Sequence, residues 1–255
     1  MRERIQKHNI LIWYFATLVF TGGLLLLHFI WKSAGDYSVS FTQFGPLLAT
    51  FLLIGMTKDK ESSSKIWNGL CVHVQDLVYY VWAAIASFAL IGICGFVLSV
   101  ISNSPYYAWK EKAIFYLINF IAMLFGSFGE EIGWRGYLQI VLNKKFTPFF
   151  SSIIVGCLWG FWHLNYAGDI IFWLLFIVTT IELSIIFTVF LYKARGSLWT
   201  AIILHTFFNL ANRIFVWKRF STNLLLIEIA IFGLVCVIVI VINRNWIFKK
   251  KPLTL

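Results

Sequence analysis

The chain has 255 residues, of which 60% are hydrophobic, 19% aromatic and only 13% charged, and its mean hydropathy is +0.82. Soluble domains are about 45–50% apolar, so this composition excludes an ordinary soluble protein and indicates an integral membrane protein. The formal net charge is +10, but the basic residues gather at the ends of apolar segments and form no continuous stripe, which argues against nucleic acid as a partner.

Eight apolar segments follow one another along the chain, most of them close to the roughly 20 residues that a helix needs to cross a bilayer. The predicted spans are residues 9–31, 41–56, 78–101, 113–142, 148–166, 169–192, 197–214 and 222–243. No repeat, low-complexity tract or long linker interrupts them. The sequence therefore predicts an all-α polytopic membrane helix bundle of about eight transmembrane helices. Residues 1–255 are expected to form a single integral membrane domain.

The positions of the basic residues predict how the chain is oriented. If both termini face the cytoplasm, the inside segments hold 14 Lys and Arg residues and the outside segments hold 6. Arg135 is counted in neither group because it lies within a span. An excess of positive charge on the cytoplasmic side is the usual bias of membrane proteins. We therefore expect a multi-pass protein of the cell membrane with cytoplasmic N- and C-termini.

The fourth span contains three charged residues in the stretch "FGSFGEEIGWRGYLQ", residues 125–139. A charge at the bilayer centre costs about 2.5–3.5 kcal/mol even on insertion scales, so such residues are functional candidates. Glu131 and Arg135 are four residues apart, which places them on one helix face where they can pair. Glu130 is rotated by about 100° from Glu131. A purely structural ion cluster is the alternative, but one pair does not account for Glu130.

Two later spans carry further polar residues. In "CLWGFWHLNY" His163 follows Trp159 by four residues on the same helix face, although a single histidine near a helix end is also typical of interfacial packing. In "LWTAIILHTFFNLAN" His205 and Asn209 share one face of an apolar helix. Unsatisfied polar groups are costly in lipid, so this pair is expected to find partners inside the bundle.

Other polar residues of the apolar spans give weaker signals. Glu182 and Glu228 are isolated in the sixth and eighth spans, where either one caps a helix contact or contributes to a proton path. The four cysteines are scattered without CxxC or CxxH spacing, so neither a disulfide framework nor a zinc knuckle is indicated.

The three polar segments together supply two carboxylates, a guanidinium, two imidazoles and an amide. A carboxylate can take a proton from water, an imidazole can share that proton, and His and Asn donors can hold an oxyanion. These are the requirements of water-driven amide hydrolysis. The same residue types also bind divalent metals such as zinc, although the compact HExxH unit is absent. A Ser or Cys nucleophile is disfavoured, because there is no GxSxG and no cysteine lies within a turn of either histidine.

These motifs resemble those of the CPBP intramembrane peptidases, also called the Abi family. That family groups CAAX prenyl endopeptidases with bacterial bacteriocin-processing and self-immunity proteins. Its EExxxR motif is matched by Glu130, Glu131 and Arg135. Its FxxxH motif is matched in part, with His163 as the histidine and Trp159 in place of phenylalanine. We interpret this departure as bearing more on the shape of the wall of the site than on its chemistry.

The third family motif, HxxxN or HxxxD, is matched by His205 and Asn209. The resemblance covers about residues 110–215, which we take as the catalytic core region. It implies a glutamate-dependent endopeptidase in which Glu130, supported by His163, activates the water. In that scheme His205 and Asn209 stabilise the oxyanion, and the ion pair of the first motif organises the site. The family is regarded as working without a bound metal, so we expect no cofactor and keep a divalent metal such as zinc as an open alternative.

The implied substrates are membrane-associated proteins or short hydrophobic peptides, in CAAX processing, bacteriocin or signal-peptide processing, or self-immunity. Two other function classes are weighed against this one. One is a non-catalytic regulatory or immunity protein of the same fold, and the other is a proton-coupled transporter, for which buried Glu and His residues are also expected. The lipid bilayer is the remaining expected partner, and the sequence indicates no oligomeric state.

Overall fold

The computed structural model describes residues 2–30, 41–103, 113–164, 168–216 and 221–250, and within these ranges it is helical, without a strand. The first half of this part contains α1 (Arg2–Lys7), α2 (Asn9–Ile30), η2 (Phe41–Phe44), α3 (Gly45–Thr57), α4 (Lys60–Leu70), η3 (Val74–Asp76) and α5 (Leu77–Ser102). The second half contains α6 (Ala113–Gly133), η4 (Trp134–Leu138), α7 (Gln139–Asn143), α8 (Pro148–Trp162), α9 (Ile170–Lys193), α10 (Leu198–Phe215) and α11 (Thr222–Ile247). The predicted all-α fold is confirmed.

Each predicted span coincides with helical structure, but the helices differ in length. Five segments of the described chain are long and apolar enough to cross a membrane; they are Asn9–Leu27, Val74–Ser102, Ile114–Asn143, Ile170–Lys193 and Thr222–Ile247. Phe41–Thr57 and Pro148–Trp162 are shorter apolar helices. The helices are those of a multi-pass membrane protein, while the number of eight crossings stays a prediction. The predicted spans 9–31 and 148–166 end in residues outside the described part.

The fourth predicted span is not a uniform α-helix. After Gly133 the chain forms one π-helical segment, η4, before α-helix resumes in α7. A π turn inserts an extra residue into the helix and is often found at functional sites. This one begins three residues after Glu131 and contains Arg135.

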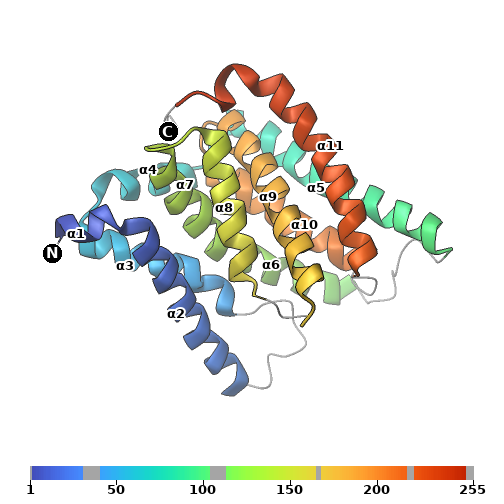
Figure 1. Ribbon diagram of the computed structural model, residues 1–255, viewed down its shortest axis with the longest axis horizontal. Helices are drawn as coiled ribbons and strands as arrows, with labels where there is room; N and C mark the ends of the chain where they lie inside the picture. The colour runs from blue at the N-terminus through green and yellow to red at the C-terminus, as the bar shows by residue number, and fades with distance from the viewer. Residues whose placement is uncertain (1, 31–40, 104–112, 165–167, 217–220, 251–255) are drawn as a thin grey trace.

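Helix α10 lies inside the bundle, where it packs against α5, α6 and α9. Figure 1 shows α2 and α3 on one side of α8, α9 and α10, and α5 and α11 toward the other side. The outer helices carry exposed apolar side chains such as Leu11, Val100 and Ile242. Apolar residues face outward as lipid contact requires, while the polar residues of α10 face neighbouring helices.

Hydrogen bonds between helices support this packing. Ser87 Oγ of α5 donates to the carbonyl of Leu204 in α10, at 2.8 Å. Thr180 Oγ1 of α9 donates to the carbonyl of Gly156 in α8, at 3.0 Å. Small hydroxyl residues are typical at helix interfaces in membranes, because they allow close approach and add bonds of about 0.6–2 kcal/mol. These contacts fix α10 relative to α5 and α9 relative to α8.

Ion pairs connect the loops at one end of the bundle. Glu61 of α4 pairs with Lys144 at 2.8 Å and with Lys65 at 3.1 Å. These ammonium groups, Lys144 first, lower the pKa of Glu61 below its ordinary value. Arg195, in the turn before α10, pairs with the buried Asp76 at 2.7 Å. The Glu61–Lys144 and Asp76–Arg195 pairs attach the α4–α5 region to the segments that carry the polar motifs.

Candidate active site

The first motif lies at the C-terminal end of α6 and in η4. Glu131 and Arg135 are fully buried, and Arg135 Nη1 lies 2.9 Å from Glu131 Oε1. The ion pair expected from the i, i+4 spacing is therefore present. Glu130, which is 2% exposed, forms no ion pair among the residues that the structure describes.

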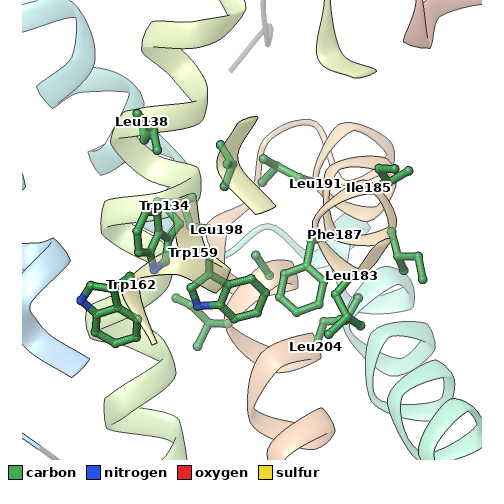
Figure 2. Close-up of a cluster of buried hydrophobic side chains, with 14 of the residues drawn as sticks. Trp134, Leu138, Trp159, Trp162, Leu183, Ile185, Phe187, Leu191, Leu198 and Leu204 are labelled. Atoms are coloured by element: carbon green, nitrogen blue, oxygen red, sulfur yellow. The ribbon is translucent and has the colours of Figure 1, made fainter. Parts of the chain in front are cut away.

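The guanidinium of Arg135 is enclosed by aromatic rings. Its central carbon lies 4.7 Å from the ring centroid of Trp159 and 4.6 Å from that of Phe187. Figure 2 shows the rings of Trp159 and Phe187 beside one another, with those of Trp134 and Trp162 in the same buried cluster. Such stacking contributes about 2 kcal/mol or more when the cation is desolvated. Arg135 is thus held by one carboxylate and two rings.

His205 of α10 meets the first motif directly. Its Nδ1 lies 2.8 Å from Glu131 Oε1, the same oxygen that binds Arg135. A carboxylate oxygen accepts, so Nδ1 carries the hydrogen and Nε2 is left for another partner. The sequence predicted a polar partner for His205 without identifying it, and that partner is Glu131.

His163 caps the C-terminal end of α8. Its Nδ1 lies 2.9 Å from the carbonyl oxygen of Trp159 and donates to it, so Nε2 of the neutral ring is an acceptor. The rings of Trp162 and Phe176 lie against His163, each at a centroid distance of 4.9 Å. The helix ends immediately afterwards, because Leu164 has a positive φ of 56°. Half-buried and held from three sides, the imidazole has a fixed direction.

Glu130 has two hydrogen-bond donors that the sequence did not predict. Gln43 Nε2 donates to Oε1 at 3.0 Å, and Trp159 Nε1 donates to Oε2 at 2.9 Å. The sequence interpretation, that Trp159 bears more on wall shape than on chemistry, did not include the hydrogen bond from its indole N–H to Glu130. An amide within an apolar run was the available signal for Gln43.

A cavity of about 450 Å³ joins the three motifs. Four of the six predicted site residues line it: Glu130, His163, His205 and Asn209. The pair Glu131–Arg135 is absent from its lining and lies behind Glu130 and His205. Glu228 of α11 also lines the cavity, whereas Glu182 does not. The prediction from the sequence was the same for Glu182 and Glu228, and only the packed structure shows that Glu228 alone of the two reaches the cavity.

Metal binding was left open by the sequence. The part of the chain that the structure describes holds no group of three or more His, Cys, Asp and Glu side chains arranged to bind a metal ion. Elemental analysis of the purified protein with a chelator challenge tests this alternative directly. Stoichiometric zinc together with chelator-sensitive activity would support a metal site.

Comparison with known proteins adds to this geometry. Residues 112–211 match the family model described as "Type II CAAX prenyl endopeptidase Rce1-like". The chain is 23% identical to CAAX prenyl protease 2 of Methanococcus maripaludis over 274 residues, covering 96% of this chain and 97% of that protein. It is 26% identical to Lysostaphin resistance protein A of Staphylococcus haemolyticus over 129 residues, covering 48% of this chain and 35% of that protein. The matched range contains all six predicted site residues.

Proposed function

Because the chain belongs to the CPBP family of intramembrane peptidases, we propose that it hydrolyses peptide bonds with a water molecule activated by Glu130. One observation carries this proposal. Glu130, His163, His205 and Asn209, from three helices, line the same cavity. A base, a second proton acceptor and two potential oxyanion donors around one space are what amide hydrolysis requires.

In the proposed reaction, the carboxylate of Glu130 takes a proton from water as the water oxygen attacks the scissile carbonyl carbon. Two of the lone-pair sites of this carboxylate are occupied by Gln43 and Trp159, so others are free to accept from water. His163 Nε2 accepts the second water hydrogen and orients the attack, since its Nδ1 is committed to a backbone carbonyl. General-base assistance of this kind contributes about 10²–10⁴-fold to a rate.

The tetrahedral intermediate carries its negative charge on the former carbonyl oxygen. Asn209 donates to this oxyanion from its amide, and His205 donates from Nε2 when both ring nitrogens carry protons. Glu131 and Arg135 hold His205 in position from behind. Collapse of the intermediate breaks the C–N bond, and Glu130 returns its proton to the leaving nitrogen. The products are a new carboxyl terminus and a new amino terminus.

The proposed substrates are membrane-associated or short hydrophobic peptides at the cell membrane. Apolar side chains, those of Met123, Phe176, Leu183 and Phe208, line the cavity beside the polar residues. Such a surface suits an aliphatic or prenyl group next to the scissile bond. A relative named CAAX prenyl protease 2 favours a CAAX-type peptide as the first substrate to try. Bacteriocin or signal-peptide processing remains within the same proposal.

Cleavage of a defined peptide tests the proposal. Purified wild-type protein in lipid vesicles is incubated with a farnesylated peptide ending in a CAAX sequence and with an unprenylated hydrophobic peptide, and the products are identified by mass spectrometry. We expect cleavage of at least one peptide by the wild type and none by Glu130→Ala or His205→Ala proteins that remain folded. Cleavage that survives Glu130→Ala would refute the mechanism.

A non-catalytic regulatory or immunity protein of the same fold is the second candidate. Its support is the similarity to a protein named for lysostaphin resistance, a name that states a phenotype and no activity. The two candidates differ in one outcome. A cellular phenotype that persists in both Glu130→Ala and His205→Ala strains would favour the non-catalytic role for that phenotype.

A further inference from the structure

The two adjacent carboxylates of the site have different partners. Glu131 Oε1 binds two groups able to carry positive charge, the guanidinium of Arg135 and the imidazole of His205. Glu130 is bound by two neutral donors, the amide of Gln43 and the indole of Trp159, one on each oxygen. Neutral donors fix the orientation of a carboxylate without neutralising its negative charge. The two hydrogen bonds, one on each oxygen, therefore restrict the rotation of the Glu130 side chain without pairing it with a positive charge.

The position of Gln43 depends on the surface of α6. A Cβ at residue 126 would lie 2.6 Å from Cδ and 2.8 Å from Nε2 of Gln43, and a Cβ at residue 129 would lie 2.9 Å from the Gln43 carbonyl oxygen. Glycine at both positions lets η2 lie directly on α6, one turn before Glu130. The glycines of "FGSFGEE" thus bring an amide from a segment 87 residues away to the first carboxylate.

Neighbouring side chains also fix the position of Trp159. Besides the Arg135 contact, its ring lies 5.3 Å from the His205 ring and 6.0 Å from the Phe187 ring, measured between centroids. Phenylalanine at this position would keep the packing but has no N–H to donate. The second donor to Glu130 is therefore a consequence of tryptophan at position 159 in this chain.

We propose that Gln43 and Trp159 are positioning residues that hold the Glu130 carboxylate in the orientation required for it to take a proton from the attacking water. This inference rests on the proposed function. Neither residue transfers a proton itself; each restricts the rotation of Glu130. A misplacement of about 1 Å in a reacting group can lower a rate by about 100-fold, so loss of either donor is expected to affect turnover more than substrate binding.

Single substitutions with a matched control test this role. Trp159→Phe and Gln43→Leu each remove one donor. Trp199→Phe makes the same chemical change in α10, where the indole donates to the Leu70 carbonyl at 2.9 Å and not to Glu130, and Trp199 does not line the cavity. With a quenched-fluorescent farnesylated CAAX peptide, we expect kcat to fall by about 10- to 100-fold in the first two variants, with KM within about twofold of wild type. Trp199→Phe is expected to keep kcat within about twofold.

A second readout separates positioning from general structural damage. In a Glu130→Gln background, adding Trp159→Phe is expected to cause no further loss of the residual rate, because the group being positioned has already been removed. Gly126→Ala displaces Gln43 without removing its amide and is expected to reproduce the kcat loss of Gln43→Leu. Thermal unfolding of each purified variant establishes that it is folded.

The outcomes are distinguishable. If the wild type cleaves the peptide but Trp159→Phe and Trp199→Phe lose kcat equally, or the loss persists in the Glu130→Gln background, the positioning role is wrong and the proposed function stands. If folded wild-type protein cleaves neither the farnesylated nor the unprenylated peptide, the proposed function fails and this inference fails with it.

Discussion

Glu131→Gln is expected to destabilise the protein far more than Glu130→Gln, although the two residues are adjacent. Glu131 and Arg135 are both fully buried, and Glu131 Oε1 also binds His205. Removing the negative charge leaves the guanidinium buried among aromatic rings with no compensating carboxylate. Breaking a buried ion pair by removing one partner costs about 3–5 kcal/mol.

Glu130 forms no ion pair among the described residues. Its two partners are neutral donors, so an amide at this position leaves one of them without an acceptor. An unsatisfied buried donor costs about 1–3 kcal/mol. The free energy of unfolding of Glu130→Gln is therefore expected to stay closer to that of the wild type.

Denaturant unfolding in lipid–detergent micelles, followed by tryptophan fluorescence, measures both variants. The double variant Glu131→Gln, Arg135→Met is the control, because removing both charges of a buried pair is often nearly neutral. We expect it to be more stable than Glu131→Gln alone. Equal losses for the two single variants, or a double variant less stable than Glu131→Gln, would refute the assignment of the ion pair.

Four further substitutions test the packing by their effect on thermal unfolding. Gly133→Ala should destabilise the protein by about 1–3 kcal/mol, because a Cβ there would lie 2.8 Å from the Pro46 carbonyl carbon. Gly55→Ala, where a Cβ has open space, should stabilise it by about 0.5–1 kcal/mol. The reverse order of stabilities would contradict the α3–α6 packing. Leu164→Gly should stabilise by up to about 1 kcal/mol, since Leu164 is 58% exposed with a φ of 56°, and a lower melting temperature would argue against strain there. Glu228→Leu should stabilise by about 1 kcal/mol, because Glu228 is buried and its Oε1 has no hydrogen-bond partner among the described residues; destabilisation would indicate a partner in the folded protein.

The helices and the Glu131–Arg135 pair could be predicted because both depend on local sequence. Hydropathy over about 20 residues predicts a membrane helix, and a spacing of four residues places two side chains on one helix face. The contact between His205 and Glu131 could not be predicted from the sequence, since it joins residues 74 apart through the packing of α10 on α6. The π-helical turn was missed as well, because one inserted residue barely changes an apolar pattern.

Gln43 and Trp159 show a second limit. Gln43 reaches Glu130 across 87 residues, and nothing in the run around it indicates which of the charged residues its amide will meet. Trp159 was compared with a family pattern that has phenylalanine, and such a pattern cannot reveal what an added N–H does. In both cases the information lies in the close approach of η2 and α8 to α6, which becomes visible only in three dimensions.

The turnover of a folded Glu130→Gln protein tests the central claim most directly. Purified wild type and variant are compared at saturating farnesylated peptide, and the melting temperature is recorded on the same samples. The account predicts that kcat falls by about 10²–10⁴-fold, the usual contribution of a general base, in a protein that still unfolds cooperatively. A Glu130→Gln protein that retains kcat within about tenfold of wild type would contradict the claim that Glu130 activates the water.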